Sequence, residues 1–167
     1  MNKSARGGSK SPPPSAFDDA CRSLARRRQT EAEIRKKLAK RHSSAKIDEA
    51  IGKLKEYRFI DDDSLIADYS RDRINLSPRS VRMIEFELSR RGIDKEHFRR
   101  LFDAEFPDYD EVETARRALK PKLKTLMKSP AQGRREKALR FLHSRGFSYE
   151  VMVEVWGEVN QEDESDL

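Results

Sequence analysis

Apolar residues recur in three similar segments of the chain. In each segment an apolar residue is followed four positions later by Leu, then three positions further on by Arg, and then by Gly or His. The segments are Ile34 to His42, Ile84 to Gly92 and Ala138 to Gly146, and their leucines, Leu38, Leu88 and Leu142, lie 50 and 54 residues apart. Similarity at such a period is typical of stacked repeats. The pattern predicts a short array whose surface recognises a partner, instead of a fold built around a catalytic cleft.

The spacing of apolar residues along the array is helical. Phe17, Ala20, Cys21 and Leu24 follow the i, i+3, i+4, i+7 pattern of an amphipathic helix. Similar patterns along the rest of the chain predict nine helices in three groups of three, with no convincing strand. We therefore expect an all-α fold of three tandem three-helix repeats.

Several of these helices have a recognisable start. Thr30 followed by Glu33 is a capping box, in which each residue accepts a hydrogen bond from the other's backbone. Ser77-Pro78 and Ser129-Pro130 each place a capping residue before a proline, which is favoured at the first helical position. Both pairs predict a helix start.

Other residues predict caps and ends in the second and third repeats. Asp61 or Asp62 is expected to cap the first helix of the second repeat, and Asp94 to cap its third. Gly92 has the position of a left-handed C-terminal residue. Pro121 is expected to kink or stop the helix around it, because proline cannot donate the helical hydrogen bond.

The domain organisation follows from composition along the chain. Residues 1–16 are rich in Pro, Gly and basic residues and predict a disordered basic tail, whereas residues 158–167 predict a short acidic disordered tail. The repeats between them are expected at about 17–60, 61–107 and 108–157. No apolar run is long enough to span a membrane, and the single cysteine, Cys21, excludes a disulfide framework. These features predict a cytoplasmic protein.

Charge alternates along the array. Residues 22–60 carry 13 Lys and Arg against 5 Asp and Glu, a net charge of +8. Residues 61–108 carry 9 against 12, a net charge of −3, and residues 109–157 carry 11 against 6, a net charge of +5. One continuous basic face would be typical of a plain DNA-binding domain. Alternating signs favour a partner with both acidic and basic surface.

No group of residues suggests catalysis, a metal or a cofactor. His42, His97 and His143 are widely separated, with no Cys or carboxylate at the spacing of a metal site. Asp61-Asp62-Asp63 could suggest a divalent cation, but carboxylates at a helix N-terminus are the favoured interpretation. We therefore expect a binding protein and not an enzyme.

The middle helix of each repeat is expected to present a basic outer face. Because successive helical residues are rotated by about 100°, Lys36 and Lys40 lie opposite Ile34 and Leu38. The corresponding positions in the other repeats are Phe86 with Arg90 and Arg140 with Ser144, and Arg79 and Arg82 share the side of Phe86. Basic residues on such a face are often only solvated. An outward Phe needs cover from either a neighbouring repeat or a partner.

Four stretches in chain order resemble the RecX family, bacterial regulators of the RecA recombinase. They are residues 20–38, residues 57–69 with the Asp61-Asp62 pair, Glu87 to Ile93 and Leu142 to Phe147. The resemblance covers about residues 17–157. Several places depart from the family pattern: His42 stands where the first repeat often has Gly, Ile74-Asn75-Leu76 replaces a Gly-rich turn, and the N-terminal tail and residues 120–134 match poorly.

The resemblance implies three tandem three-helix repeats in an elongated, curved molecule. It also implies binding in the groove of the RecA–DNA filament, inhibition of recombinase, ATPase and coprotease activity, and a role in DNA repair and the SOS response without enzymatic activity. The family's basic positions fall on Arg27, Arg35, Arg73, Arg82 and Arg145. Together with the outward faces, the candidate contact residues are Arg27, Arg35, Lys36, Arg73, Arg79, Arg82, Phe86, Arg140 and Arg145.

Two functions remain open on these grounds. The first is a monomeric modulator of a RecA filament, with weak, sequence-independent contacts to DNA and none to a membrane. The second is a direct DNA-binding protein or repressor, because paired helices joined by a tight turn also describe helix-turn-helix units. The acidic middle repeat argues against the second.

Overall fold

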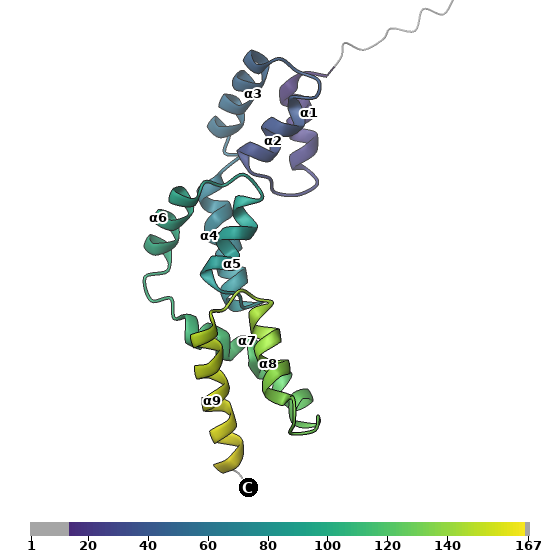
Figure 1. The fold of residues 1–167 in the computed structure, drawn as a ribbon. Helices are drawn as coiled ribbons and strands as arrows, with labels where there is room; N and C mark the ends of the chain where they lie inside the picture. The colour runs from purple at the N-terminus through teal and green to yellow at the C-terminus, as the bar shows by residue number, and fades with distance from the viewer. Residues whose placement is uncertain (1–13, 166–167) are drawn as a thin grey trace, which may run out of the picture. The chain divides into compact units, whose positions relative to one another are not determined.

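The described part of the chain is helical. The computed structural model describes residues 14–165, and the side chains of residues 14–159. It contains no strand in that range and nine helices (Figure 1): α1 Ala16–Leu24, α2 Glu31–Leu38, α3 Ser44–Glu56, α4 Asp62–Asn75, α5 Val81–Ser89, α6 Lys95–Glu105, α7 Glu111–Met127, α8 Arg134–His143 and α9 Tyr149–Ser165. The chain divides into two compact units after Ile60, with α1 to α3 in the first and α4 to α9 in the second. The basic tail expected at the N-terminus lies, up to residue 13, outside the described residues.

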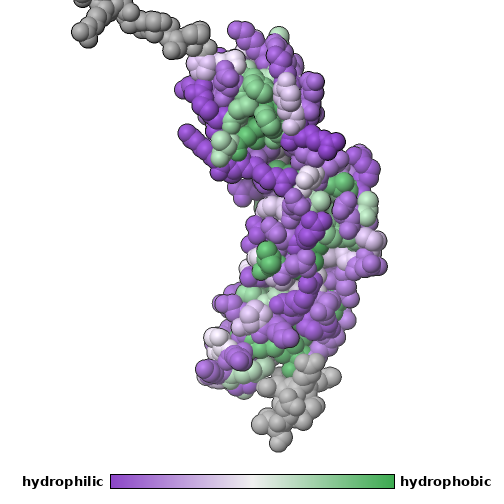
Figure 2. Space-filling model, turned by 180° about the vertical axis from the view of Figure 1, so that it is seen from behind, coloured by the Kyte–Doolittle hydropathy of each residue, from purple (hydrophilic) through white to green (hydrophobic). Residues whose placement is uncertain are grey.

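Three separate clusters of buried side chains correspond to the three expected repeats. Leu38, Leu88 and Leu142, the residues that defined the repeat, are each buried in a different cluster. Polar side chains cover most of the face in Figure 2, and apolar side chains reach the surface in patches between them. Tyr109, which was expected in the third repeat, packs against the second cluster.

In the first unit, capping residues set the starts of the first two helices. The Thr30 hydroxyl accepts a hydrogen bond from the Glu33 backbone, and the Glu33 carboxylate accepts one from the Thr30 backbone, which confirms the predicted capping box. Ser15 and Asp18 form the same arrangement before α1. Each box satisfies backbone N–H groups that the helix leaves free. The two helices then present Ala20, Ile34 and Leu38 to the core.

The turn after α2 differs from its counterparts because it lacks glycine. Gly92 and Gly146 adopt φ values of 87° after α5 and α8, as expected for left-handed helix ends. At the corresponding position the His42 backbone N–H donates to the Leu38 carbonyl at 3.0 Å, and its φ is not positive. The imidazole instead lies 2.8 Å from an Asp19 carboxylate oxygen.

Two predicted helix starts are wrong. Ser80, not Ser77, caps α5, because α4 continues to Asn75 and the Ser77 backbone N–H still donates to the Asp72 carbonyl. Ser129 does not open α8, which begins at Arg134 after Gly133 in the left-handed region. The Arg134 guanidinium donates to the carbonyls of Ser129 and Met127. It therefore satisfies acceptors at the end of α7.

Two helices are longer than expected. α7 continues through Pro121 to Met127, so of the two expected effects, a kink or a stop, the stop does not occur. Leu119 and Leu126 are buried on either side of the proline, and this burial offsets the hydrogen bond that Pro121 cannot make. α9 extends to Ser165, so residues that were expected to form a disordered acidic tail from residue 158 are helical, and Val159 is buried.

Gly146 is expected to be intolerant of a side chain. A Cβ atom at this position would lie 2.6 Å from Ser80 Oγ and 2.7 Å from Met83 Cβ, and its φ of 87° disfavours any L-residue. Gly146→Ala should lower the free energy of unfolding by at least about 1 kcal/mol, measured by thermal or urea denaturation. Gly157→Ala is the control, because nothing lies near its Cβ and Ala is favoured in a helix by about 0.5–1 kcal/mol. Equal stability of the two variants would contradict this packing.

Candidate binding surface

In the first unit, two of the three predicted contact residues are held by carboxylates. The Arg27 guanidinium donates to both Glu33 oxygens, at 3.0 and 3.3 Å. Arg35 lies between Glu31 and Asp48, at 2.6 Å from each, and so ties α2 to α3. Lys36 is exposed, and its ammonium makes no ion pair with any residue in the described range. Lys36 therefore has the greatest freedom to contact a partner.

In the second unit, Glu87 gathers two predicted contact residues. Its Oε2 accepts hydrogen bonds from the Tyr69 hydroxyl at 2.7 Å and from Arg73 Nε at 2.9 Å. Arg79 Nε lies 3.3 Å from Oε1 but makes no hydrogen bond there. Arg73 also stacks over the Tyr69 ring at 4.6 Å. Burial, and then the hydrogen bond to Glu87, raise the pKa of Tyr69, so the phenol stays a neutral donor.

Glu87 is thus expected to stabilise the junction of α4 and α5. Its carboxylate stands between two guanidinium groups, and its removal would leave them facing each other. Glu87→Gln should lower the free energy of unfolding by about 1–3 kcal/mol, measured by urea denaturation. Glu136→Gln is the control, because Glu136 and its partner Arg140 are both exposed, and such pairs contribute about 0–1 kcal/mol. A loss at Glu87 no larger than at Glu136 would contradict this role.

Arg145 is the predicted residue with the most unusual surroundings. Its guanidinium stacks on the Phe141 ring at 4.0 Å, and its buried Nε has no hydrogen-bond partner among the described residues. Burial, and then the nearby positive charge of Arg79, lower its pKa, although an arginine remains charged at neutral pH. Arg140, by contrast, is exposed and paired with Glu136. Arg145 therefore lies near a second cation, Arg79, which itself lies beside the Glu87 carboxylate.

Phe86 points away from the core, as predicted. It is 55% exposed, so no neighbouring repeat of the second unit covers the ring. The Arg90 guanidinium lies 5.9 Å from the ring, at the edge of a cation–π contact. Arg82 is also exposed and makes no ion pair within residues 61–159. We call Arg82, Phe86 and Arg90 the α5 surface.

Two of the three histidines and the first residue of the aspartate run have structural partners. His42 contacts Asp19, and His97 contacts Asp63 at 2.6 Å between Nε2 and Oδ1. Asp61 caps α4 by accepting a hydrogen bond from the Ser64 backbone, which decides between the two predicted caps. Over the residues that the structure describes, no group of three or more His, Cys, Asp or Glu side chains could hold a metal ion. None of the helices described is long and apolar enough to cross a membrane.

Sequence reasoning missed two features of the first unit. Cations from the ends of α1 and α2 line a cavity, and three aromatic rings meet beside the end of α3. The net charge of +8 over residues 22–60 signals the first, but it does not say which cations converge. The aromatic residues Tyr57 and Phe59 were visible only as part of a family motif.

Known regulatory proteins match the chain over most of its length. Residues 16–54 match the first three-helix domain of RecX. The regulatory protein RecX of Finegoldia magna is 32% identical over 145 residues, which cover 85% of this chain and 70% of that protein. The chain belongs to the RecX family. The RecX of Chlorobaculum tepidum is 31% identical over 141 residues, which cover 84% of this chain and 85% of that protein.

Solved RecX structures share the fold. The crystal structure of RecX from Lactobacillus salivarius matches with a TM-score of 0.68 at 22% identity, over 87% of this chain and 95% of that one. A second RecX crystal structure has the same TM-score at 23% identity, over 85% of this chain and 71% of that one. The expected all-α fold of tandem three-helix repeats is therefore confirmed. The relatives are named regulatory proteins, so the family is a regulatory one and not a family of enzymes.

Proposed function

We propose that this RecX-family protein binds the RecA filament on DNA and inhibits the recombinase, ATPase and coprotease activities of RecA. It would do so in the cytoplasm, by binding and without catalysis of its own, as one way to modulate DNA repair and the SOS response. Membership of the RecX family supports the proposal, together with a surface whose exposed residues are suited to contact both protein and phosphate.

The observation that carries the proposal is the α5 surface. Aromatic and arginine side chains are enriched in the cores of protein interfaces, where a few such residues supply most of the binding energy. Phe86 is a large exposed ring flanked by Arg82 and Arg90, and no carboxylate pairs with either cation in the second unit. This combination fits a partner that offers an apolar contact beside negative charge.

A RecA filament on DNA would supply both kinds of contact. Phosphates attract Lys and Arg without regard to base sequence, so contacts to them favour the filament without selecting a site. Lys36 on α2 and the α5 surface are available for them, whereas Arg27, Arg35, Arg73 and Arg79 already stabilise the protein itself. Bridging neighbouring RecA subunits would resist the conformational changes that accompany ATP hydrolysis.

The alternative is a helix-turn-helix protein that reads duplex DNA directly. A recognition helix places hydrogen-bonding side chains against base edges in the major groove. The outward face of α5 instead carries Phe86, and the second repeat is net acidic. Both observations favour the filament.

Co-sedimentation with RecA tests the proposal. Filaments assembled on single-stranded DNA with a non-hydrolysable ATP analogue should carry the protein into the pellet at physiological salt. RecA without DNA and nucleotide, and duplex DNA without RecA, should carry much less. Pelleting with duplex DNA alone that matches pelleting with filaments would favour the alternative, and no pelleting with filaments would refute the proposal.

A further inference from the structure

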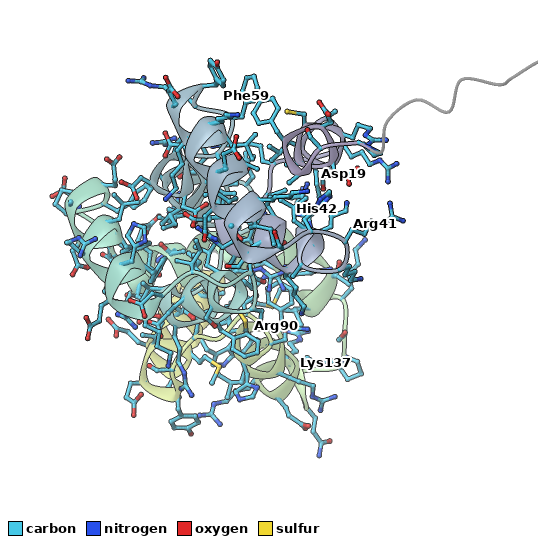
Figure 3. The ribbon with its side chains drawn as sticks, turned by 90° about the horizontal axis from the view of Figure 1, so that it is seen from above. Asp19, Arg41, His42, Phe59, Arg90 and Lys137 are labelled. Atoms are coloured by element: carbon cyan, nitrogen blue, oxygen red, sulfur yellow. The ribbon has the colours of Figure 1, made fainter. Side chains whose placement is uncertain are left out.

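The first unit contains a concave basic surface between the ends of two helices. A cavity of about 370 Å³ opens where α1 and α2 end (Figure 3). The cations that line it are Arg22, Arg26, Lys37, Lys40 and Arg41. Asp19, Ser23, Leu38 and His42 complete the lining. Convergence of five cations in one cavity is costly for the protein alone and favours an anionic ligand.

The carboxylate of this cavity does not cancel the charge. Asp19 is already bound by the His42 ring at 2.8 Å and by the Arg22 guanidinium at 2.5 Å. The hydrogen bond from His42 and the charges of Arg22 and Arg41 lower the pKa of Asp19, so it stays ionised and occupied. Arg26 and Lys40 are exposed, and their side chains make no ion pair within residues 14–60. The cavity therefore keeps free positive charge.

A second cavity continues this surface toward the start of α1. It measures about 450 Å³ and lies between α1 and α3. It shares Arg41 and His42 with the first cavity, and Phe17 and Lys46 also line it, together with Lys53 and its ion-pair partner Glu49 at 2.7 Å. Phe17 thus belongs to both features, because it lines the second cavity and its ring also packs against two other aromatic rings.

Three aromatic side chains form an exposed cluster at this end. The ring centroids of Tyr57 and Phe59 lie 5.9 Å apart, and Phe17 lies 6.3 and 6.5 Å from them. Tyr57 is 59% exposed and Phe59 is 55% exposed. In Figure 3, Phe59 lies on one side of α1 and Asp19, His42 and Arg41 lie on the other; Phe17, which lines the second cavity, packs against Phe59. Large rings left in water are suited to bind a flat apolar partner.

The backbone holds the two exposed rings together at some cost. Arg58, between them, has a φ of 55° and is the one described non-glycine residue with a positive φ. The Phe59 backbone N–H donates to the Leu54 carbonyl at 2.8 Å, and that of Arg58 donates to Lys55 at 2.9 Å, which is a Schellman ending of α3. Glycine is the usual residue here, because a left-handed conformation disfavours other residues by about 1–2 kcal/mol. A conformation retained despite this cost is a feature often found at functional positions.

We propose that this surface binds a single strand of nucleic acid, with backbone phosphates in the basic cavity and bases stacked on Tyr57 and Phe59. We call it the strand surface. Proteins that bind single strands combine a positive groove with aromatic side chains on which bases stack. A duplex keeps its bases stacked inside, and an acidic peptide does not carry a flat ring beside every negative charge, as a single strand does. The inference rests on the proposed function, because the strand would be the DNA of the filament, but it is testable without RecA.

The test measures binding of the full chain to fluorescein-labelled oligothymidylate by anisotropy, without RecA, over a range of salt. The cation variant carries Arg26→Gln, Lys40→Gln and Arg41→Gln. It should reduce the slope of log affinity against log salt by about 2, because each lost phosphate contact contributes about 0.7. The control variant, Arg100→Gln, Lys124→Gln and Lys128→Gln, removes the same charge from exposed positions of the second unit and should keep most of the slope.

The ring variant, Tyr57→Ala with Phe59→Ala, separates stacking from charge. It should weaken binding about tenfold or more per lost base stack and leave the salt slope unchanged. Tyr57→Phe with Phe59→Trp should restore most of the affinity, because both replacements keep a stacking face. Circular dichroism should show wild-type helicity for all variants, since the substituted side chains are exposed.

Several results would overturn the strand surface. They are wild-type affinity in the ring variant, an equal loss of slope in the control variant, and competition by polyglutamate as strong as that by oligothymidylate. The proposed function is tested independently of the strand surface. Loss of DNA binding by the cation and ring variants supports the strand surface even if the wild-type protein leaves RecA activity unchanged. Conversely, if these variants bind DNA as the wild-type protein does, inhibition of RecA can still be observed and still supports the proposed function.

Discussion

Leu88→Ala is expected to lower the free energy of unfolding by about 2–5 kcal/mol. Leu88 is fully buried in the cluster between α4, α5 and α6, and truncation of a buried leucine loses apolar contact and leaves a cavity. Leu38 and Leu142 have the same position in their own clusters and should behave alike. Urea denaturation followed by circular dichroism measures the change.

Leu76→Ala is the control for this prediction. Leu76 is also a leucine of the second unit, but its side chain is 79% exposed, and surface substitutions usually change stability by less than about 0.5 kcal/mol. If all three repeat leucines tolerated alanine as well as Leu76 does, the repeats would not be held together by the three clusters described above.

Charge reversal at exposed cations should remove inhibition of RecA without unfolding the protein. We expect a variant with Lys36→Glu, Arg82→Glu and Arg90→Glu to need at least about tenfold more protein for half-maximal inhibition of RecA ATP hydrolysis. Each substitution replaces a charge-assisted contact to phosphate or carboxylate with repulsion. Arg79 is left unchanged, because it lies beside Glu87 and a glutamate there would destabilise the second unit itself.

A matched variant shows whether position or net charge is responsible. Arg100→Glu, Lys124→Glu and Lys128→Glu changes the net charge equally at exposed positions away from the α5 surface. It should inhibit RecA nearly as well as the wild-type protein. Phe86→Ala should weaken inhibition further and leave the melting temperature nearly unchanged, because the ring is exposed. Full inhibition by the Lys36, Arg82 and Arg90 variant would exclude these residues from the interface.

Helices and their buried faces could be predicted from the sequence, because both depend on local spacing. Ile34 with Leu38, and Ile84 with Leu88, follow helical periodicity, and all four are buried. Caps formed by neighbouring residues, such as Thr30 with Glu33, were also predictable, since a capping box is contained within four residues.

Helix boundaries at prolines were not predictable, because they depend on packing. Leu126 is buried against the third cluster and carries α7 past Pro121, and the length of α4 moves the next cap from Ser77 to Ser80. Local sequence contains the proline but not the buried surface that offsets it.

The sequence predicted which side chains of the candidate surface point outward, but not which of its cations are free of ion pairs. Helical geometry placed Lys36 and Phe86 outward, and both are exposed. Whether a cation is free depends on carboxylates brought in by other helices, such as Asp48 of α3 beside Arg35. For the same reason, the convergence of cations from α1 and α2 in the strand surface could not be read from their spacing.

The most direct test of the proposed function is the rate of ATP hydrolysis by RecA on single-stranded DNA, titrated with the full-length wild-type protein at physiological salt. We predict that the rate falls with increasing protein and saturates at a ratio below one protein per RecA subunit, because each molecule would contact more than one subunit. A rate that stays unchanged in excess protein, while RecA remains bound to the DNA, would contradict the account.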